Sequence, residues 1–338
     1  MPLLTLVLCS RNDSYAGNSV WQLETTLNFA AHQVESLGCE QDVEIIVADW
    51  GSATALREVL RLSPVAARIT RFLEISPGFA SELQQDSPFA EVFANNAAIR
   101  RATGDFIGRI DQDTLVGGSF FERFLAGLRE SAAARQRWSE GLLFVGRRSI
   151  PEAFARTTPP FHDVVRYVER FGRRLPREGR LQSPWFDAPV GIVILSRELW
   201  EAYRGYDERL IYWGFMEADL GYRATINRCA YDLEREIGLD FLHLAHSRAW
   251  FAPTRRTMNP RREPSIEVPN DPDWGLATVE VPLRKAEPAE PIECEWVAGP
   301  GSGISEVLAE VGRQSVLTAA RVGRRLVKVL LTTPGGGA

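Results

Sequence analysis

The sequence contains few lysines, histidines and cysteines. Among its 338 residues only Lys285 and Lys328 are lysines, and there are four histidines and four cysteines. The cysteines lie far apart and form no C-x-x-C pair, which excludes a zinc ribbon and argues against a disulfide scaffold in a chain of this length. The formal net charge of −5 argues against a broad surface for nucleic acid, so no nucleic-acid partner is expected.

Long apolar runs are also absent. No stretch of about 18 apolar residues occurs, which excludes a membrane-spanning helix. The apolar run Leu3–Cys9 is short and has no basic region before it, so it predicts a buried first strand rather than a signal peptide. Together these features predict a protein of a reducing compartment, the cytoplasm.

Strand and helix signals alternate over residues 1–115. Segments with helical spacing separate four apolar runs, which are Leu3–Cys9, Val43–Ala48, Ala67–Ile75 and Asp105–Ile110. This alternation predicts an α/β fold with a mixed, mainly parallel sheet flanked by helices. Ligands of such sheets bind beyond the carboxyl ends of the strands. Three polar turns fall at these ends and are the first functional indication: Ser10–Asp13, Asp49–Ser52 and Asp111–Thr114.

The composition changes along the second half of the chain. Residues 151–187 hold seven arginines and are expected to form an irregular insert, followed by an apolar strand at Val190–Ser196. Residues 259–303 are rich in proline and end in a glycine-rich run, which predicts an extension and linker. Residues 304–333 have helical spacing, with acids early and bases late, as suits the helix dipole. They predict a C-terminal amphipathic helix.

The tripeptide Asp111-Gln112-Asp113 directly follows an apolar run. Two carboxylates one residue apart can hold Mn²⁺ or Mg²⁺, and the metal can neutralise a diphosphate. The same pattern occurs by chance in solvated turns, and the position at the end of a strand favours the functional interpretation.

Four segments in the first part of the chain and two in the second follow one another in a fixed order and together carry a resemblance to a known family. The first four are Cys9-Ser10-Arg11-Asn12, Glu44 to Ser52, Asn95 to Asp105 and Asp111-Gln112-Asp113, and the last two are Ala188 to Glu208 and Tyr212 to Arg223. Over roughly residues 3–250 the chain resembles a GT-A-fold glycosyltransferase of the family 2 type. The last segment also resembles the W-G-x-E-D region of galactosyltransferases.

The resemblance implies a domain division and a donor. Residues 1–258 would be the glycosyltransferase domain, with a nucleotide-sugar half (1–115) and an acceptor half (116–258). The donor would be a nucleotide-diphosphate sugar, by default a UDP-sugar, and the acceptor a glycan, a polysaccharide or a lipid-linked saccharide. The residues expected to bind the donor are Ser10, Arg11, Asp49, Asn96, Arg100, Asp111, Gln112, Arg255 and Arg256.

The resemblance also implies catalytic and metal-binding roles. Glu217 would be the general base that deprotonates the acceptor hydroxyl in an inverting displacement, with Asp219 beside it. Asp111, Asp113 and His246, together with His243, would hold Mn²⁺ or Mg²⁺. Trp185, Trp213 and Gly214 would contact the acceptor.

Each of these residues also has a plain structural interpretation. Glu217 could stabilise the dipole of its helix, a contribution of about 0.3–1 kcal/mol. Asp219 could do the same, and a histidine pair three residues apart is more often structural than a ligand. Arg255 and Arg256 lie in an acid-free segment and could close over a diphosphate, which guanidinium groups bind well, or form a solvated loop.

Two positions depart from the family pattern. Trp50 stands where the family's turn has a second acid, and Met216 stands where the family has the first acid of its E-D pair. The first change is expected to be tolerated, and the second leaves the identity of the acceptor open. The C-terminal helix leaves three alternatives open: packing on its own domain, a homodimer, or contact with an anionic membrane surface.

Two other functions compete with sugar transfer. The run Phe106 to Thr114 also matches the h-h-h-h-D-x-D-x-T strand of haloacid-dehalogenase-type phosphatases, in which the first aspartate is a nucleophile. That strand usually opens a chain, whereas several strand and helix signals precede it here. The second alternative is a degenerate relative that binds saccharide or serves as a scaffold, supported only by Trp50 and Met216.

Overall fold

The computed structural model describes most of the first 289 residues. The described ranges are 1–13, 17–182, 187–189, 192–226, 228–238, 240–246, 258–260 and 263–289. They belong to one compact unit, Met1–Pro291. Trp185, Arg255, Arg256 and the expected helix 304–333 lie outside the described residues.

The core of the fold is an eight-stranded sheet in the order β11-β6-β10-β4-β1-β2-β3-β13. Strands β4, β1, β2 and β3 run parallel to one another, whereas β10 pairs antiparallel with both β4 and β6, and β13 pairs antiparallel with β3. This confirms the predicted mixed, mainly parallel α/β fold. The strands are β1 (Leu4–Ser10), β2 (Val43–Trp50), β3 (Thr70–Ile75), β4 (Phe106–Arg109), β6 (Leu142–Phe144), β10 (Val193–Ser196), β11 (Ala230–Asp232) and β13 (Leu283–Lys285).

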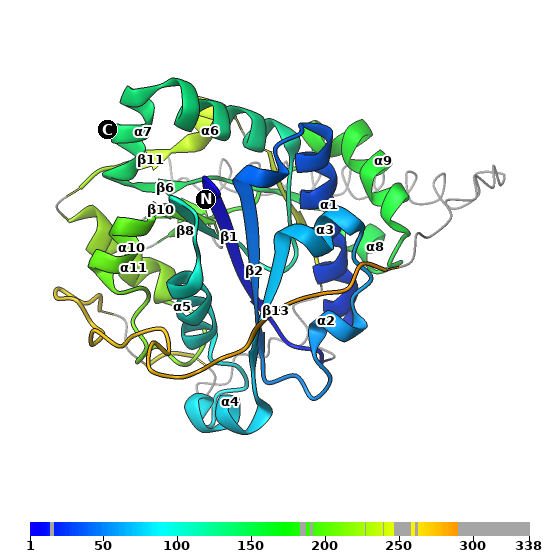
Figure 1. The fold of residues 1–338 in the computed structure, drawn as a ribbon. Helices are drawn as coiled ribbons and strands as arrows, with labels where there is room; N and C mark the ends of the chain where they lie inside the picture. The colour runs from blue at the N-terminus through cyan, green and yellow to red at the C-terminus, as the bar shows by residue number, and fades with distance from the viewer. Residues whose placement is uncertain are drawn as a thin grey trace, which may run out of the picture. The chain divides into compact units, whose positions relative to one another are not determined.

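Helices cover both faces of this sheet, because its central strands are apolar on both sides. One layer consists of α1 (Ser19–Ser36), α3 (Pro64–Ile69), α6 (Gly118–Glu130), α7 (Ala132–Ser139) and α12 (Leu233–Ile237). The other consists of α4 (Pro77–Gln84), α5 (Glu91–Arg101), α10 (Arg197–Tyr203) and α11 (Met216–Thr225). Figure 1 shows α1 and α3 on one side of β1 and β2, with α5, α10 and α11 on the other.

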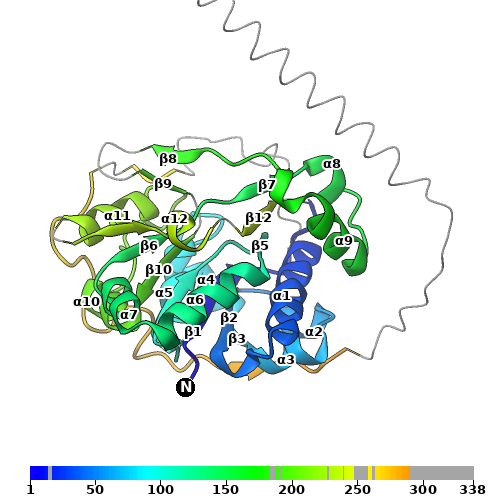
Figure 2. The same cartoon turned by 90° about the horizontal axis from the view of Figure 1, so that it is seen from above.

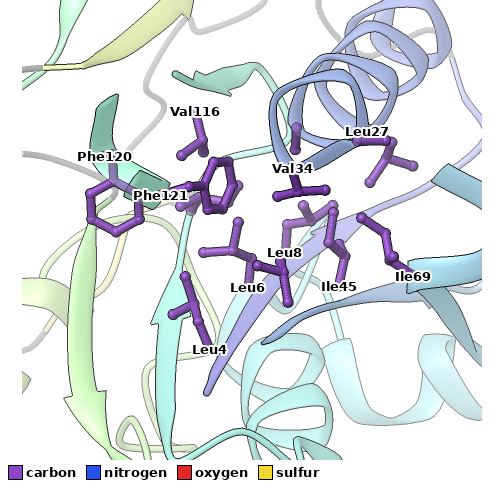
Figure 3. Close-up of a cluster of buried hydrophobic side chains, with 14 of the residues drawn as sticks. Leu4, Leu6, Leu8, Leu27, Val34, Ile45, Ile69, Val116, Phe120 and Phe121 are labelled. Carbon is purple, nitrogen blue, oxygen red and sulfur yellow. The ribbon is translucent and has the colours of Figure 1, made fainter. Parts of the chain in front are cut away.

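The alternation of side chains along β1 divides the core between these layers. Leu4, Leu6 and Leu8 are fully buried and pack with α1 and α6, as Figure 3 shows, whereas Val7 belongs to the cluster on the opposite face. Successive side chains of a strand point to opposite faces, so an apolar strand of this kind serves both layers. The arrangement fixes β1 at the centre of the sheet.

A small second sheet lies beside the first, with β12 (Phe241–Leu244) between β5 (Thr114–Val116) and β7 (Arg148–Ile150) (Figure 2). In its register His243 lies opposite Thr114, the residue that follows Asp113. The backbone N–H of Leu244 also donates to the carbonyl of Asp113, over 2.9 Å. The sheet therefore brings the chain near residue 243 against the Asp111–Asp113 turn.

The insert 151–187 is more regular than its composition predicts. It contains α8 (Glu152–Ala155), α9 (Phe161–Phe171), the 3-10 turn η3 (Gly172–Arg174), and the two strands β8 (Arg180–Gln182) and β9 (Asp187–Pro189). The ring of Tyr167 from α9 stacks on Phe154 from α8, with centroids 4.1 Å apart. The apolar residues of α9 recur at helical spacing, and burial of the face that they form stabilises this helix despite the surrounding arginines.

The segment after residue 258 is part of the domain in the described residues 258–260 and 263–289. Trp274 is buried, β13 pairs with β3, and the guanidinium of Arg101 donates to the carbonyls of Gly275, Leu276 and Val279 over 2.9–3.0 Å. The compact unit therefore extends past residue 258, the expected end of the glycosyltransferase domain, because apolar residues between the prolines pack into the core. The remaining short elements are α2 (Leu56–Val59) and the 3-10 turn η2 (Glu40–Asp42).

Among the described residues, no helix combines the length and apolarity that crossing a bilayer requires.

Candidate active site

The three polar turns meet at the carboxyl edge of the parallel strands. Ser10 lies opposite Asp49 in the β1–β2 register, and the hydroxyl of Ser10 donates to the side-chain oxygen of Gln112. The backbone N–H of Asn12 donates to the hydroxyl of Ser52 over 2.8 Å. The sequence predicted this convergence, which follows from the shared direction of β1, β2 and β4.

Asp49 is buried at the end of β2. Its carboxylate accepts hydrogen bonds from the backbone N–H of Leu56, over 2.7 Å, and from the hydroxyl of Ser52. Burial raises the pKa of Asp49, while these hydrogen bonds lower it in part. The carboxylate therefore holds the turn in shape, and its contact with a nucleotide base stays a prediction.

Arg11 lies at the rim of this edge. Its Nε is 2.7 Å from a carboxylate oxygen of Asp13, and its guanidinium lies over the ring of Phe89, with 5.5 Å between the guanidinium carbon and the ring centroid. The side chain is about one quarter exposed, so its charge can still reach a ligand. Ser10, Arg11, Asp49, Asp111 and Gln112 are thus brought to one edge.

Asp113, His243 and His246 form a cluster that could hold a metal ion. The Nε2 atoms of His243 and His246 lie 3.3 and 3.2 Å from the same oxygen of Asp113, Oδ2. Two ligand atoms bound at right angles to one ion, each about 2.1 Å away, would be about 3 Å apart. The other oxygen, Oδ1, is buried without a hydrogen-bond partner in the described part of the chain. These donors fit a divalent metal that accepts both oxygen and nitrogen.

Glu178 orients one of these histidines. Its carboxylate bonds to Nδ1 of His243, which leaves Nε2 to face Asp113. A carboxylate that accepts from the far nitrogen of a ligating histidine fixes its tautomer and raises its basicity. Glu178 also pairs with Arg147, so it links the histidine to a second charged group. Sequence reasoning missed Glu178, which belongs to the insert and reaches the site only through the fold.

Charged neighbours shift the pKa values of three residues in this cluster. Burial alone would raise the pKa of Asp113, but His243, His246 and Arg147 together lower it well below the usual range. Burial lowers the pKa of His243, but Asp113 and Glu178 outweigh it and raise this pKa to about 9. Burial opposes the shift of Glu178 too, and its partners lower that pKa to about 2. The site therefore favours positive charge between its two acids.

Asp111 faces arginines rather than the histidines. Its Oδ1 lies 2.9 Å from Arg109 and its Oδ2 lies 2.7 Å from Arg147. Among the described residues the three-donor metal cluster consists of Asp113, His243 and His246 without Asp111. A carboxylate held by two guanidinium groups is also a poor nucleophile, which argues against the phosphatase alternative.

Glu217 lies near the same charges at the beginning of α11. Its side chain is 12% exposed and its carboxylate lies 3.4 Å from Arg109. Burial raises the pKa of Glu217, whereas Arg109 lowers it in part. Glu91 also pairs with Arg109, and burial together with the charges of Glu217 and Asp111 raises its pKa to about 7. A base with a raised pKa suits proton abstraction near neutral pH.

This network holds an excess of negative charge. Two guanidinium groups, those of Arg109 and Arg147, and the imidazole of His243, which is protonated at neutral pH, meet five carboxylates: those of Glu91, Asp111, Asp113, Glu178 and Glu217. A divalent cation would offset the excess. Arg109 is 97% buried at the end of the apolar strand β4. A charged residue in an otherwise apolar strand is rarely buried without a partner, so this pattern in the sequence could have identified Arg109 as part of the site.

The loop before Glu217 leaves the ring of Trp213 partly exposed to solvent. Trp213 is 47% exposed, and Gly214 and Phe215 both have left-handed backbones, with φ of 78° and 75°. Phe215 is the N-cap of α11, so the loop sets the direction in which that helix presents Glu217. Trp213 and Gly214 thus belong to the loop that leads into the helix of Glu217, and their contact with an acceptor stays a prediction.

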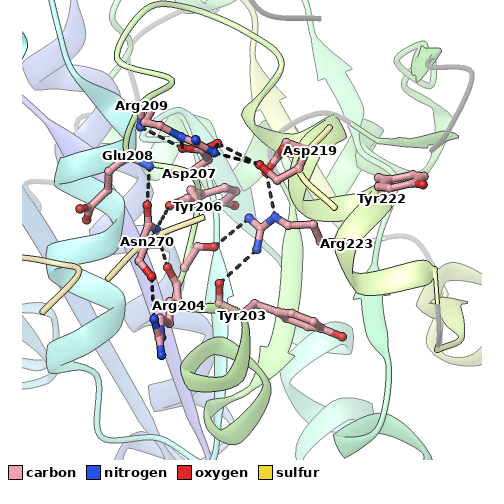
Figure 4. A network of polar contacts seen from close by, with 12 residues as sticks. Tyr203, Arg204, Tyr206, Asp207, Glu208, Arg209, Asp219, Tyr222, Arg223 and Asn270 are labelled. Atoms are coloured by element: carbon pink, nitrogen blue, oxygen red, sulfur yellow. Dashed lines mark hydrogen bonds and ion pairs between the residues drawn. The ribbon is translucent and has the colours of Figure 1, made fainter. Parts of the chain in front are cut away.

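Asp219 is directed away from this site. It is fully buried, pairs with Arg223 at 2.9 Å and accepts from the backbone N–H of Ser265 over 2.6 Å. Figure 4 shows it in a network with Asp207 and Arg209. These contacts favour the structural alternative for Asp219, because a carboxylate locked in a buried pair is not available to an acceptor.

Asn96 and Arg100 are not brought to the carboxyl edge either. The side chain of Asn96 donates to the carbonyl of Tyr206 and accepts from its N–H, both over 2.8 Å. Arg100 lies near the C-terminal end of α5, with its guanidinium over Trp274. The helix leads away from that edge toward β4, so only its first turn, with Glu91, faces the site.

The two departures from the family pattern are explained by packing. Trp50 is fully buried, stacks on Phe93 with 6.4 Å between centroids, and donates to Gln84 over 3.0 Å. Met216 is also buried, at 4% exposure. Both side chains fill the core beside the site, so their presence does not by itself support a degenerate scaffold.

No family model matches the chain. It is 24% identical over 249 residues to validoxylamine A glucosyltransferase of Streptomyces hygroscopicus subsp. jinggangensis (strain 5008), which covers 70% of this chain and 54% of that protein. The validoxylamine A glucosyltransferase of subsp. limoneus gives the same identity over 51% of its length. The chain thus spans about half the length of the curated relatives it matches.

Solved structures with a similar arrangement include S. aureus TarS 1–349 in complex with UDP-GlcNAc, with a TM-score of 0.44, 12% identity, and coverage of 73% of this chain and 59% of that chain. Another is the catalytic domain of Drosophila β1,4-galactosyltransferase 7 with xylobiose, with a TM-score of 0.42, 14% identity, and coverage of 80% and 84%. The two curated relatives are both glucosyltransferases, the class of enzyme that the resemblance names.

Proposed function

We propose that the chain is a metal-dependent inverting glycosyltransferase that uses a nucleotide-diphosphate sugar. The observation that carries the proposal is the union, in one charge network, of a metal-ligand cluster (Asp113, His243, His246) with an acid of raised pKa (Glu217). The network lies where the parallel strands end, the usual ligand site of such sheets. The similarity to named glucosyltransferases supports the same chemistry.

The donor would lie along the edge formed by Ser10, Arg11, Asp49 and Gln112, with its diphosphate toward Asp113 and the histidines. Mn²⁺ or Mg²⁺, when bound there, would neutralise the diphosphate as the leaving group. UDP is the default nucleotide by the resemblance, and the described residues do not choose between bases. Asp111, held between two guanidinium groups, would act on the donor side without binding the metal directly.

Glu217 would act as the general base. As the acceptor oxygen forms its bond to the anomeric carbon, the bond from that carbon to the diphosphate oxygen breaks and its electron pair leaves with the diphosphate. Glu217 takes the acceptor's proton. Attack opposite the leaving group inverts the anomeric carbon, and general-base catalysis typically accelerates such a step about 10²–10⁴-fold. Arg109 would keep Glu217 ionised in its buried position.

The acceptor would be a saccharide or a related polyhydroxylated compound, placed against the half-exposed ring of Trp213. Aromatic rings offer an apolar face to sugar C–H groups. Polysaccharide or lipid-linked acceptors stay proposals, as do a cytoplasmic location and a peripheral membrane or dimer contact through residues 304–333, which lie outside the described residues.

Titration calorimetry with UDP, GDP, CDP and TDP, each with and without Mn²⁺, tests the donor half of this proposal. We expect one diphosphate to bind only when the metal is present. Release of that diphosphate from its sugar conjugates, screened with glucose, galactose and N-acetylglucosamine donors and with validoxylamine A as a trial acceptor, tests transfer. Failure of all four diphosphates to bind would contradict the proposal.

The raised pKa of Glu217 predicts the pH dependence of transfer. The carboxylate must be deprotonated to accept a proton, so activity should be complete above its pKa and decline as the pH falls through it. We expect the decline of kcat to begin at a higher pH than it would for an ordinary glutamate, whose pKa is about 4.3. Binding of UDP with Mn²⁺, measured over the same pH range as kcat, separates loss of the base from loss of the metal. A kcat that declines only where an ordinary glutamate titrates would contradict the assignment.

A further inference from the structure

Asn259 is hydrogen-bonded to the loop that precedes Glu217. Its side-chain amide donates to the carbonyls of Tyr212, over 2.7 Å, and Gly214, over 2.6 Å, and its side-chain oxygen accepts from the N–H of Tyr212, over 3.1 Å. Its backbone N–H donates to the carbonyl of Trp213, over 3.1 Å. Asn259 is 99% buried, so water cannot replace these bonds.

The loop held by these bonds has a strained backbone. Gly214 and Phe215 follow each other with positive φ, and a positive φ is unfavourable for a bulky residue such as Phe215. Such a conformation persists only where its surroundings enforce it. Asn259 bonds to the carbonyl of Gly214, the peptide group directly before Phe215, so it acts where the strain lies.

We infer that Asn259 is a positioning residue for sugar transfer, an inference that rests on the proposed function. Phe215 caps α11, and its carbonyl accepts from Asp219 in the first turn of that helix, over 2.9 Å. Any relaxation of the loop therefore moves the beginning of α11, which carries Glu217, and the ring of Trp213 together. Asn259 is not part of the Asp113, His243 and His246 cluster, and its role in transfer would be exerted through the loop.

The chain offers a matched control in Asn270. Its amide donates to the carbonyls of Arg204, over 2.6 Å, and Tyr206, over 2.5 Å, and its oxygen accepts from the N–H of Glu208, over 3.0 Å (Figure 4). It is 93% buried and belongs to the same segment of the chain. Asn270 thus makes the same kind of contact with a loop that does not lead directly into Glu217.

The experiment compares Asn259→Ala with Asn270→Ala in the full chain. Hydrogen exchange of the backbone amides, followed by mass spectrometry, should show at least tenfold faster exchange over residues 211–217 in Asn259→Ala and over 204–208 in Asn270→Ala. Release of UDP from UDP-glucose with Mn²⁺, with water as acceptor, uses the same general base. We expect its kcat to fall about tenfold in Asn259→Ala, with unchanged affinity for UDP and Mn²⁺, and to stay near the wild-type value in Asn270→Ala.

Each outcome bears on a different statement. Equal exchange over residues 211–217 in wild type and Asn259→Ala overturns the inference, whatever the enzyme's activity. The inference is also wrong if both variants lose kcat equally, because a general loss of stability then explains the effect. If the wild type neither binds UDP nor releases it from UDP-glucose, the proposed function fails, while the exchange data still decide whether Asn259 holds the loop.

Discussion

Replacing Glu217 by glutamine is expected to reduce kcat for transfer about 10³-fold, within the usual range for loss of a general base. Glutamine keeps the size of the side chain but cannot accept the acceptor's proton. The Asp113, His243 and His246 cluster does not include Glu217, so the affinity for UDP with Mn²⁺ should change less than about threefold. Release of UDP in a coupled assay measures kcat, and calorimetry measures binding. Transfer at a near wild-type rate would rule out Glu217 as the base.

Asp219→Asn is the matched control for this variant. Asp219 lies two residues further along the same helix and pairs with Arg223 inside the core. Removing one charge of a buried pair typically costs about 3–5 kcal/mol of stability. We therefore expect Asp219→Asn to lower the free energy of unfolding while the folded enzyme keeps its kcat. If Asp219→Asn lost kcat without losing stability, the result would support a catalytic role for Asp219.

Replacing Asp113 by asparagine is expected to remove metal-dependent nucleotide binding. The variant loses the one carboxylate that faces both His243 and His246, and with it the negative charge that attracts the cation. We expect the affinity for UDP in the presence of Mn²⁺ to fall at least about 100-fold, to the value measured without metal. In the wild type, Mn²⁺ at about 100 times its Kd should raise stability by about 2.7 kcal/mol, and the variant should lose this gain.

Two further variants separate a ligand from a general charge effect. Glu178→Gln keeps the cluster but weakens the orientation of His243, so a smaller loss, of about 10–100-fold in metal affinity, is expected. Asp105→Asn removes an acid at the other end of β4, which pairs with Arg135 at 2.6 Å, and should leave metal binding unchanged. Equal metal affinity in wild type and Asp113→Asn would show that the cluster is not the metal site.

The site could be predicted from the sequence where its residues follow their strands directly. The turns after β1, β2 and β4 are local features, and strands that run parallel bring their carboxyl ends to one edge whatever the side chains are. The sequence around Asp113 and around Glu217 was sufficient to predict both as site residues, and the structure brings both into one charge network. Asn96 and Arg100 were selected by the same resemblance, but in α5 the side chain of Asn96 is buried against Tyr206 and that of Arg100 lies over Trp274.

The residues that sequence reasoning missed come from pairings between distant parts of the chain. Arg147 and Glu178 reach Asp111 and His243 across separations of 36 and 65 residues. Asn259 reaches Tyr212 from a segment whose prolines predicted a linker. No local spacing encodes such contacts, because they depend on which strand lies beside which.

The sequence by itself therefore determined the alternation of strands and helices, the sheet that follows from it, and the acids at the ends of its strands, since periodicity and turn residues act over a few positions. Only the tertiary structure decided which charges meet. It paired Asp111 with two arginines, directed Asp219 into the core, and completed the metal cluster with His243 of β12 and His246 just beyond that strand. The physical reason is that burial makes an unpaired charge costly, so each buried acid is stable only where the fold supplies its partner.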